Sequence, residues 1–105
     1  MSIHIGGSDR WHVRPMYRAI VELLRREKFS DVTVLRGVGG YGSSSVYHTE
    51  KILRLSQDLP IVIEIVDSQE KIDAFLPVLE AMMSSGLVTL EKVRVLQYGT
   101  DMLRP

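Results

Sequence analysis

The order of the hydrophobic patterns constrains the fold of this chain more than any other feature. Six stretches carry a period typical of regular structure, and glycine, proline or polar residues separate them. The patterns predict strands over residues 2–6, 31–35, 61–66 and 87–98, the last clearest at 93–96, and helices over residues 15–28 and 67–85. This order, βαββαβ, predicts an α+β, ferredoxin-like fold in which a four-stranded antiparallel sheet carries two helices on one face.

Both helices carry local signals for their ends. Pro15 suits the first turn of the first helix, where its missing N–H costs nothing. Asp67, with Glu70 three residues later, resembles a capping box at the start of the second helix. Pro77 lies within the second pattern and predicts a kink in one continuous helix. Gly86 is the residue at which we expect this helix to stop.

Length and composition restrict the chain to a few classes of protein. The 105 residues fit a single domain, 1–105, in which residues 98–105 are expected to form a flexible tail. Basic and acidic residues number 13 each, so no global field attracts nucleic acid or an anionic membrane. No apolar run is long enough to insert into a bilayer, and the N-terminus lacks a signal-peptide pattern. We therefore expect a cytoplasmic protein.

The period of two in the strands separates two faces of the sheet. The face that meets the helices collects Ile3, Ile5, Val32, Val34, Ile61, Ile63, Ile65, Val93 and Val95. The opposite face collects His4, Thr33, Leu35, Val62, Glu64, Val66, Arg94, Leu96 and Tyr98. Exposed apolar patches of this kind usually mark interaction surfaces, so we expect a homo-oligomer with Glu64 and Arg94 paired in the contact. The alternative is a half-exposed antiparallel face with scattered apolar residues, which is common.

A glycine-rich stretch connects the second and third strands. Residues 37–42 match G-x-G-x-x-G, but the dinucleotide mechanism also needs a helix directly after the glycines and a doubly wound sheet. Neither is predicted here. The connection, residues 38–59, is much longer than a hairpin loop, and its second half is too apolar for a purely disordered segment. It could bind an anion through backbone N–H groups or fold against a partner.

Other candidate sites have less support. Residues 6–10 could surround an anion with backbone N–H groups, or could form an ordinary turn in which Asp9 makes local hydrogen bonds. His4, His12 and His48 lack the spacing of metal ligands, so we expect no metal site. No nucleophile elbow orients a serine as a hydrolase requires, and the third strand lacks the aromatic residues of an RNA-recognition module.

Five segments stand out in chain order: IGGSDR at 5–10, VLRGVGGYG at 34–42, HT at 48–49, ILRLSQDLPIVIEIVD at 52–67 and GLVTLEKVRV at 86–95. Together they resemble domain-of-unknown-function family 190, which is grouped with PII-like signalling proteins. The resemblance covers nearly the whole chain. It implies a homotrimer of ferredoxin-like subunits whose sheets face the threefold axis. It also implies that ligands such as adenine nucleotides bind in clefts between subunits, while a long loop contacts a target.

The resemblance also indicates ligand-binding residues. On one subunit they are Arg36, Gly37, Gly39, Gly40 and Gly42, from the glycine-rich stretch. From a neighbouring subunit they are Ser85, Gly86, Leu87, Val88 and Thr89, at the turn into the last strand. His48 is added because it lies inside the long loop. We expect no catalytic residue and no resident cofactor.

Two functions of different classes are therefore expected from this chain. The first is a non-enzymatic, trimeric PII-like regulator that senses a small anionic ligand, such as an adenine nucleotide, and signals through residues 38–59. The second is a structural or adaptor subunit that docks a protein partner through the same loop without a small ligand. A thermal-shift panel of nucleotides and carboxylates separates the two, because only a ligand that binds the native state raises its melting temperature.

Overall fold

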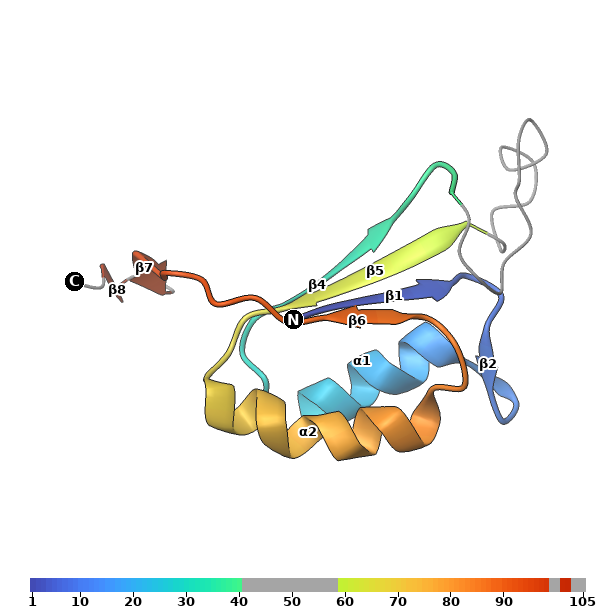
Figure 1. Cartoon of the computed structure of the whole chain (residues 1–105), viewed down its shortest axis with the longest axis horizontal. Helices are drawn as coiled ribbons and strands as arrows, with labels where there is room; N and C mark the ends of the chain where they lie inside the picture. The colour runs from blue at the N-terminus through green and yellow to red at the C-terminus, as the bar shows by residue number, and fades with distance from the viewer. Residues whose placement is uncertain (41–58, 99–100, 103–105) are drawn as a thin grey trace.

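A computed structural model describes residues 1–40, 59–98 and 101–102 of the chain. Its elements in order are β1 (Ser2–Gly6), β2 (Arg10–Trp11), β3 (Arg14–Pro15), α1 (Met16–Arg26), β4 (Val32–Arg36), β5 (Pro60–Ile65), α2 (Gln69–Met82), β6 (Leu87–Thr89), β7 (Gln97–Tyr98) and β8 (Asp101–Met102). The four longer strands form one antiparallel sheet in the order β4-β5-β1-β6 (Figure 1). The predicted α+β, ferredoxin-like βαββαβ fold is confirmed.

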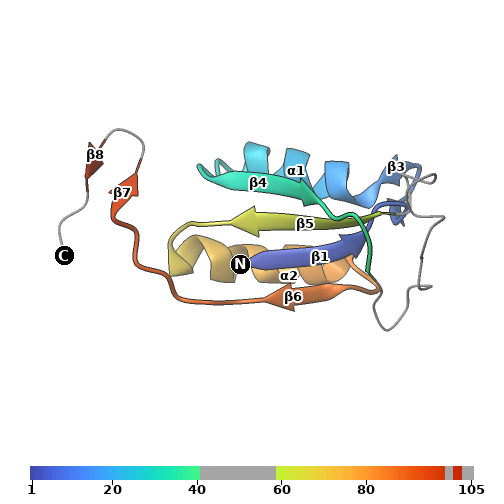
Figure 2. The ribbon, with the colours of Figure 1, turned by 90° about the horizontal axis from the view of Figure 1, so that it is seen from above.

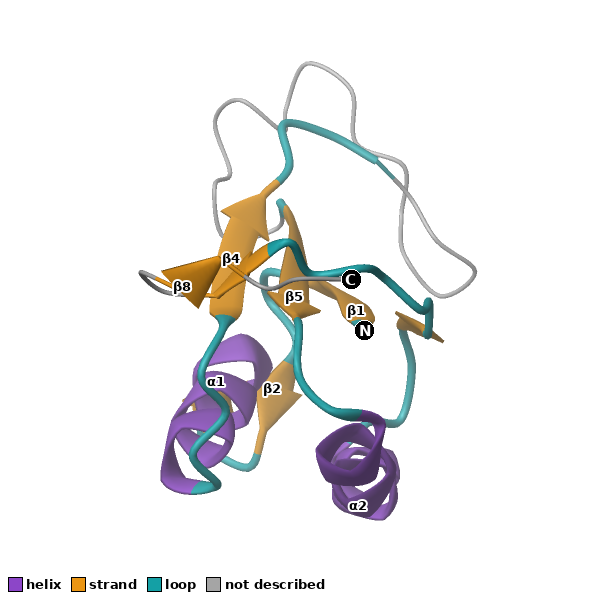
Figure 3. Ribbon diagram, turned by 90° about the vertical axis from the view of Figure 1, so that its left-hand side faces the viewer, coloured by secondary structure: helices purple, strands orange, loops and turns teal. Residues whose placement is uncertain are grey.

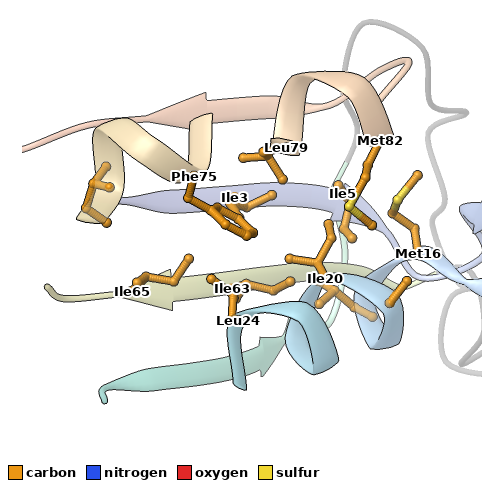
Figure 4. Packing of buried hydrophobic residues seen from close by; sticks show 13 residues of the cluster. Ile3, Ile5, Met16, Ile20, Leu24, Ile63, Ile65, Phe75, Leu79 and Met82 are labelled. Carbon is orange, nitrogen blue, oxygen red and sulfur yellow. The ribbon is translucent and has the colours of Figure 1, made fainter. Parts of the chain in front are cut away.

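Both helices cover the same face of the sheet. Figure 3 shows α1 and α2 side by side beneath the strands, with the opposite face uncovered by either helix. The core between the two layers consists of Ile3, Ile5, Met16, Ala19, Ile20, Leu24, Ile61, Ile63, Ile65, Ile72, Phe75, Leu79 and Met82 (Figure 4). All strand residues in it come from β1 and β5, because these central strands lie over the seam between the helices.

Four valines assigned to the helix-facing side of the sheet are not fully buried, and of these Val32 still packs against the core. Val34 lies on β4, which is an edge strand, and 42% of its surface is exposed. Val93 and Val95 are 59% and 36% exposed, because they lie beyond the end of β6 and outside the sheet. The assignment of Val93 and Val95 to the helix-facing side of the sheet was therefore wrong. Val34 does face the helices, from an edge strand, and the alternation along β1 and β5 was read correctly.

The last strand of the sheet is shorter than predicted and lies earlier in the chain. β6 covers Leu87–Thr89, whereas residues 93–96, where the strand pattern is clearest, are outside the sheet. The neighbour of β6 is β1, and Thr89 pairs with Ser2, the first residue of β1. Beyond Thr89 the chain has no strand beside it with which to form a ladder. Residues 90–98, called the C-terminal arm below, continue past the end of the sheet (Figure 2).

Helix α1 ends in a backbone motif that the sequence did not indicate. Pro15 is the N-cap rather than a residue of the first turn. At the other end, Lys28 N–H donates to Arg25 O and Phe29 N–H donates to Leu24 O, at 3.1 and 3.0 Å. These two bonds form a Schellman motif, with Lys28 in the left-handed region at φ 63°. The motif turns Phe29 toward Phe75 of α2, with ring centroids 5.3 Å apart.

The N-cap of helix α2 lies one residue later than predicted. Ser68 is its N-cap and accepts a hydrogen bond from Lys71 N–H at 3.3 Å, so Asp67 does not cap the helix. Pro77 lies inside the helix, which is continuous as predicted. The C-cap is Met83, and Gly86 lies three residues further on, in the turn before β6. The prediction that Gly86 stops the helix was therefore wrong; its φ of 119° serves the turn instead.

Candidate functional site

The glycine-rich stretch begins at the end of β4. Arg36 is the last residue of this strand and pairs with Ile61, at the start of β5. Gly37 N–H then donates to Pro60 O at 2.8 Å. A Cβ on Gly37 would lie 2.9 Å from Pro60 Cγ, so glycine permits this close approach of the two chain segments. The exit from β4 is therefore held tightly against the entry into β5.

The rest of the stretch is described as far as Gly40. Gly39 is exposed, and Gly40 has φ 151°, a value that other residues rarely adopt. Gly42 and His48, together with most of residues 38–59, lie outside the described residues. The structure thus places Arg36, Gly37, Gly39 and Gly40 together at one end of β4.

Two arginines meet a tyrosine beside this stretch. Arg36 Cζ lies 5.8 Å from the centroid of the Tyr17 ring, and Arg18 Cζ lies 5.9 Å from the same centroid. Arg18 Nε also donates a hydrogen bond to the Tyr17 hydroxyl at 3.2 Å. This bond lowers the pKa of Tyr17 below its ordinary value, and the positive charges of Arg18 and Arg36 add to the effect. We call Tyr17, Arg18 and Arg36 the arginine cluster.

Sequence reasoning missed two members of the arginine cluster. Arg36 has the same parity along β4 as Val32 and Val34, so its side chain leaves the strand on the side of the helices. That parity was the signal that Arg36 would reach α1. Which residues of α1 it would meet depended on the packing of the helix under the sheet. Tyr17 and Arg18 lie in the first turn of α1 and carry no motif of their own.

The second group of predicted residues lies at the turn into β6. Gly86 is packed so closely that an added Cβ would lie 2.7 Å from His4 O. Leu87 and Thr89 pair with His4 and Ser2, and so share the face of the sheet away from the helices. Val88 pairs with Ile3 and packs against the core. The exposed Ser85 lines a shallow hollow at the end of α2.

The two predicted groups are on opposite edges of the sheet. β4 and β6 are its edge strands, with β5 and β1 between them. The exit from β4 and the entry into β6 lie at the same end, because β4 and β6 run in opposite directions. Three interstrand spacings still separate these strands by about 14 Å. A single chain therefore does not bring Arg36 and Gly86 into one site.

The uncovered face of the sheet carries a row of three apolar side chains and one histidine, with one residue from each of the four strands. The register aligns Leu35 with Val62, Val62 with His4, and His4 with Leu87. The outer members, Leu35 and Leu87, are 47% and 56% exposed. The adjacent row consists of Thr33, Glu64, Ser2 and Thr89. Leu96 and Tyr98, which were also assigned to this face, belong to the C-terminal arm.

Glu64 and Arg94 lie on different parts of the molecule. Glu64 is exposed on the uncovered face, whereas Arg94 is exposed on the C-terminal arm. The ion pairs found among the described residues are those of Arg14 with Glu22 and of Lys71 with Asp67. A contact between Glu64 and Arg94 of different subunits stays a prediction.

The turn after β1 resembles an ordinary turn more than an anion site. The Asp9 carboxylate accepts a hydrogen bond from Gly6 N–H at 2.9 Å, and Asp9 N–H donates to Gly6 O at 3.1 Å. The Gly6 N–H that an anion would need therefore already donates to the Asp9 carboxylate. A short β2–β3 hairpin follows, which the sequence did not predict, with His12 at φ 58° in its two-residue loop. His4 lies on the uncovered face and His12 in this loop, so the two histidines are separated.

A groove of about 830 Å³ lies at the other end of the sheet. The start of α2, the end of β5 and residues 89–95 form its walls. The groove contains none of the arginine cluster and, of the predicted ligand-binding residues, only Thr89. In the described part of the chain, no helix is both long and apolar enough to cross a membrane.

Known proteins match this chain over most of its length. The profile of the DUF190 family, described as an uncharacterized ACR family, matches residues 1–95. A UPF0166 protein of Methanocaldococcus jannaschii is 36% identical over 96 residues, covering 90% of this chain and 88% of the relative. A UPF0166 protein of Aquifex aeolicus is 35% identical over 96 residues, covering 91% of this chain and 90% of the relative.

Proposed function

This chain belongs to the DUF190 family, and we propose that it is a PII-like, homotrimeric regulatory protein that binds a small anionic ligand between its subunits. An adenine nucleotide is the first ligand class to test. The observation that carries the proposal is the placement of the two groups of binding residues on opposite edges of the sheet. If each group forms half of a site, the site is complete only where the β4 edge of one subunit meets the β6 edge of another.

The uncovered face supports an oligomer. Leu35 and Leu87 lie at the two ends of the row that also contains Val62 and His4, and they are about half exposed in the single chain. Each large apolar side chain removed from water stabilises an assembly by roughly 1.5–3 kcal/mol when it becomes fully buried. A second copy of the same face would cover these residues, as the resemblance to PII-like proteins implies.

The arginine cluster supports an anionic ligand. Two guanidinium groups from different elements converge on the Tyr17 ring, and one of them belongs to Arg36, the residue before Gly37, while the chain as a whole has no net charge. A guanidinium group can donate two parallel hydrogen bonds to two oxygens of a phosphate or carboxylate. A glycine has no side chain, so a ligand can approach its backbone N–H closely. Attraction of an anion to this protein is therefore local to the end of β4. Binding there would act directly on residues 38–59, which follow without a break and would signal to a target.

The ligand part of the proposal can be tested by thermal shift on the wild-type chain and on two variants. The panel contains adenine nucleotides, cyclic nucleotides and small di- and tricarboxylates. A ligand at a hundred times its Kd stabilises the native state by about 2.7 kcal/mol, which raises the melting temperature by several degrees. The double variant Arg18→Gln/Arg36→Gln should lose this rise. Arg25→Gln, an exposed arginine at the far end of α1, should keep it.

The adaptor alternative gives the opposite result. If no compound in the panel shifts the wild-type melting temperature, the ligand-sensing part of the proposal is wrong. A protein partner that binds the wild-type chain and is lost when Gly39 to Ser45 are deleted would then support a docking subunit that acts through the same loop.

A further inference from the structure

We infer that the C-terminal arm of one chain adds as a further strand to the β4 edge of a second copy of the chain. The inference rests on the proposed homo-oligomer and names the contact that holds it together. The part of the arm that would pair is residues 93–96, just before β7, and the acceptor strand is Val32–Arg36.

The arm has the sequence of a strand but has no partner within its own sheet. Val93, Arg94, Val95 and Leu96 alternate and are rich in β-formers, which is why a strand is predicted there. In the folded chain this run lies outside any ladder, because β1 begins at Ser2 and the pairing of β6 with β1 ends at Thr89. A segment of this composition leaves its N–H and C=O groups to solvent unless another strand pairs with it.

Three apolar side chains of the arm are more than half exposed in the single chain. Leu90, Val93 and Leu96 are 56%, 59% and 58% exposed. The groove of about 830 Å³ lies between the arm and the start of α2, so the arm is not packed against the helix layer. Figures 1 and 2 both show the arm running past the sheet and ending in the β7–β8 pair, apart from the other strands. Exposure of three large side chains on one short segment is typical of a surface that a partner covers.

The β4 edge offers the hydrogen-bonding groups that the arm needs. Gly37 N–H bonds to Pro60 O, and Val66 N–H bonds to Asp31 O, at the two ends of the β4–β5 ladder. In an antiparallel ladder the bonded residues alternate, so the odd-numbered residues of β4 direct their backbone groups toward β5. The backbone N–H and C=O groups of Val32 and Val34 therefore point outward, along the edge of the sheet. These are the groups that an added strand would use.

The side chains of β4 also match those of the arm. Val34, which faces the helix side, is 42% exposed, and Leu35, which faces the other way, is 47% exposed. An added strand would lay one set of alternating arm side chains beside Val34 and the other set beside Leu35. The opposite edge, β6, is a weaker acceptor because it is only three residues long and is continuous with the arm itself. Five residues of β4 provide the longer and more apolar edge.

Donor and acceptor are different surfaces of the same chain. A contact between them is heterologous, so each chain both donates an arm and receives one. Such contacts close into a ring when the rotation between subunits allows it, and a three-membered ring is the arrangement required by the proposed homotrimer. The exposed β4 edge would then be covered in every subunit, which removes a site of uncontrolled strand pairing.

Substitution of Val34 tests the acceptor edge in the full chain. Val34→Pro removes an N–H that points away from β5, so the ladder within the chain should survive, and proline is tolerated on edge strands. We expect the molar mass from light scattering to fall from a multiple of the chain mass to that of one chain, 11.9 kDa. The control Val34→Thr has nearly the same shape and keeps the N–H, so it should stay oligomeric. Circular dichroism and a cooperative melt show whether each variant is folded.

Disulfide trapping tests the donor and the acceptor together. The chain has no cysteine, so introduced thiols are the only ones present. Chains carrying Val34→Cys are mixed with chains carrying one cysteine at position 93, 94, 95 or 96, and are then oxidised. Cross-linked dimers should form with at least one of the four positions, since paired strands bring Cβ atoms within about 5.5 Å. The control Val78→Cys, on the exposed side of α2, should not cross-link to any of them.

The outcomes separate this inference from the proposed function. If the wild-type chain is oligomeric, Val34→Pro is oligomeric too, and no cross-linked dimer forms, the inference is wrong while the regulatory proposal stands. If the arm joins β4 of a second copy but no ligand shifts the melting temperature, the strand addition stands and the ligand-sensing proposal fails. A wild-type chain that is monomeric at all concentrations overturns both.

Discussion

At the scale of single residues, Tyr17 reports on the arginine cluster. The hydrogen bond from Arg18, followed by the charges of Arg18 and Arg36, lowers the pKa of Tyr17 in the folded chain. We expect Arg18→Gln to raise this pKa toward the ordinary value of about 10, and Arg36→Gln to raise it less. A spectrophotometric titration of tyrosinate, with Tyr17→Phe as the reference, measures the pKa directly. A larger effect of Arg36→Gln than of Arg18→Gln would contradict the geometry.

The lowered pKa of Tyr17 also determines how this residue's contribution to stability changes with pH. A group whose pKa is lower in the folded state stabilises that state fully only above its unfolded pKa, and the contribution is lost as the pH falls through the folded pKa. The wild-type chain should therefore gain free energy of unfolding relative to Tyr17→Phe only at alkaline pH. An anion that binds between Arg18 and Arg36 should raise the pKa of Tyr17 again, because it offsets their charge.

Lys28 is a residue at which the chain can be stabilised. It occupies the left-handed position of the Schellman motif at φ 63°, a conformation that costs a residue with a Cβ about 1–2 kcal/mol. Its side chain makes none of the bonds of the motif, which are donated by backbone groups. Lys28→Gly should therefore raise the free energy of unfolding by about 1 kcal/mol, measured by urea denaturation. Lys28→Ala is the matched control and should show no comparable gain, since alanine keeps the Cβ.

At the scale of elements, α2 is capped by Ser68 and not by its neighbour Asp67. Ser68 Oγ accepts from Lys71 N–H, so Ser68→Ala should lower the free energy of unfolding by about 1 kcal/mol. Ser68→Asp keeps an acceptor at the same position and should restore most of the loss. Chemical denaturation of the three chains checks this. If Ser68→Ala left the stability unchanged, the N-cap would have to be reassigned to Asp67, the residue that the sequence favours.

The β6 element and the arm show why a strand pattern does not define a strand. Residues 93–96 alternate more clearly than Leu87–Thr89, yet only the latter form a strand of the main sheet. The difference is a neighbour: β1 is in register with residues up to Thr89 and no further. Hydrogen bonding in a strand is non-local, so its extent is set by the strand beside it rather than by its own composition.

At the scale of the whole molecule, oligomerisation should be visible in thermal unfolding. If the native state is an assembly held by the C-terminal arm, dilution favours the separated chains, and the melting temperature should rise with protein concentration. The Val34→Pro variant should melt at a temperature that does not depend on concentration. Calorimetric scans over a wide concentration range make the comparison, and equal behaviour of the two chains would argue against an assembly through the β4 edge.

The sequence by itself determined the order of the elements and the central part of the core. Both depend on local periods, namely the alternation along β1 and β5 and the apolar stripes of α1 and α2. These periods direct the same residues into the core however the elements pack in detail. It also identified Arg36, Gly37 and Gly86 as residues at the strand ends, because turns and close approaches leave a local signature in glycine.

Only the tertiary structure decided which residues meet across the chain. Tyr17 and Arg18 join Arg36 because α1 packs beneath β4, and no pattern in either element records that contact. The two groups of predicted ligand-binding residues lie on opposite edges because of the strand order β4-β5-β1-β6. Residues 90–96 have no partner strand in the main sheet because β1 begins at Ser2. In each case the deciding interaction joins residues far apart in sequence, which local periodicity cannot encode.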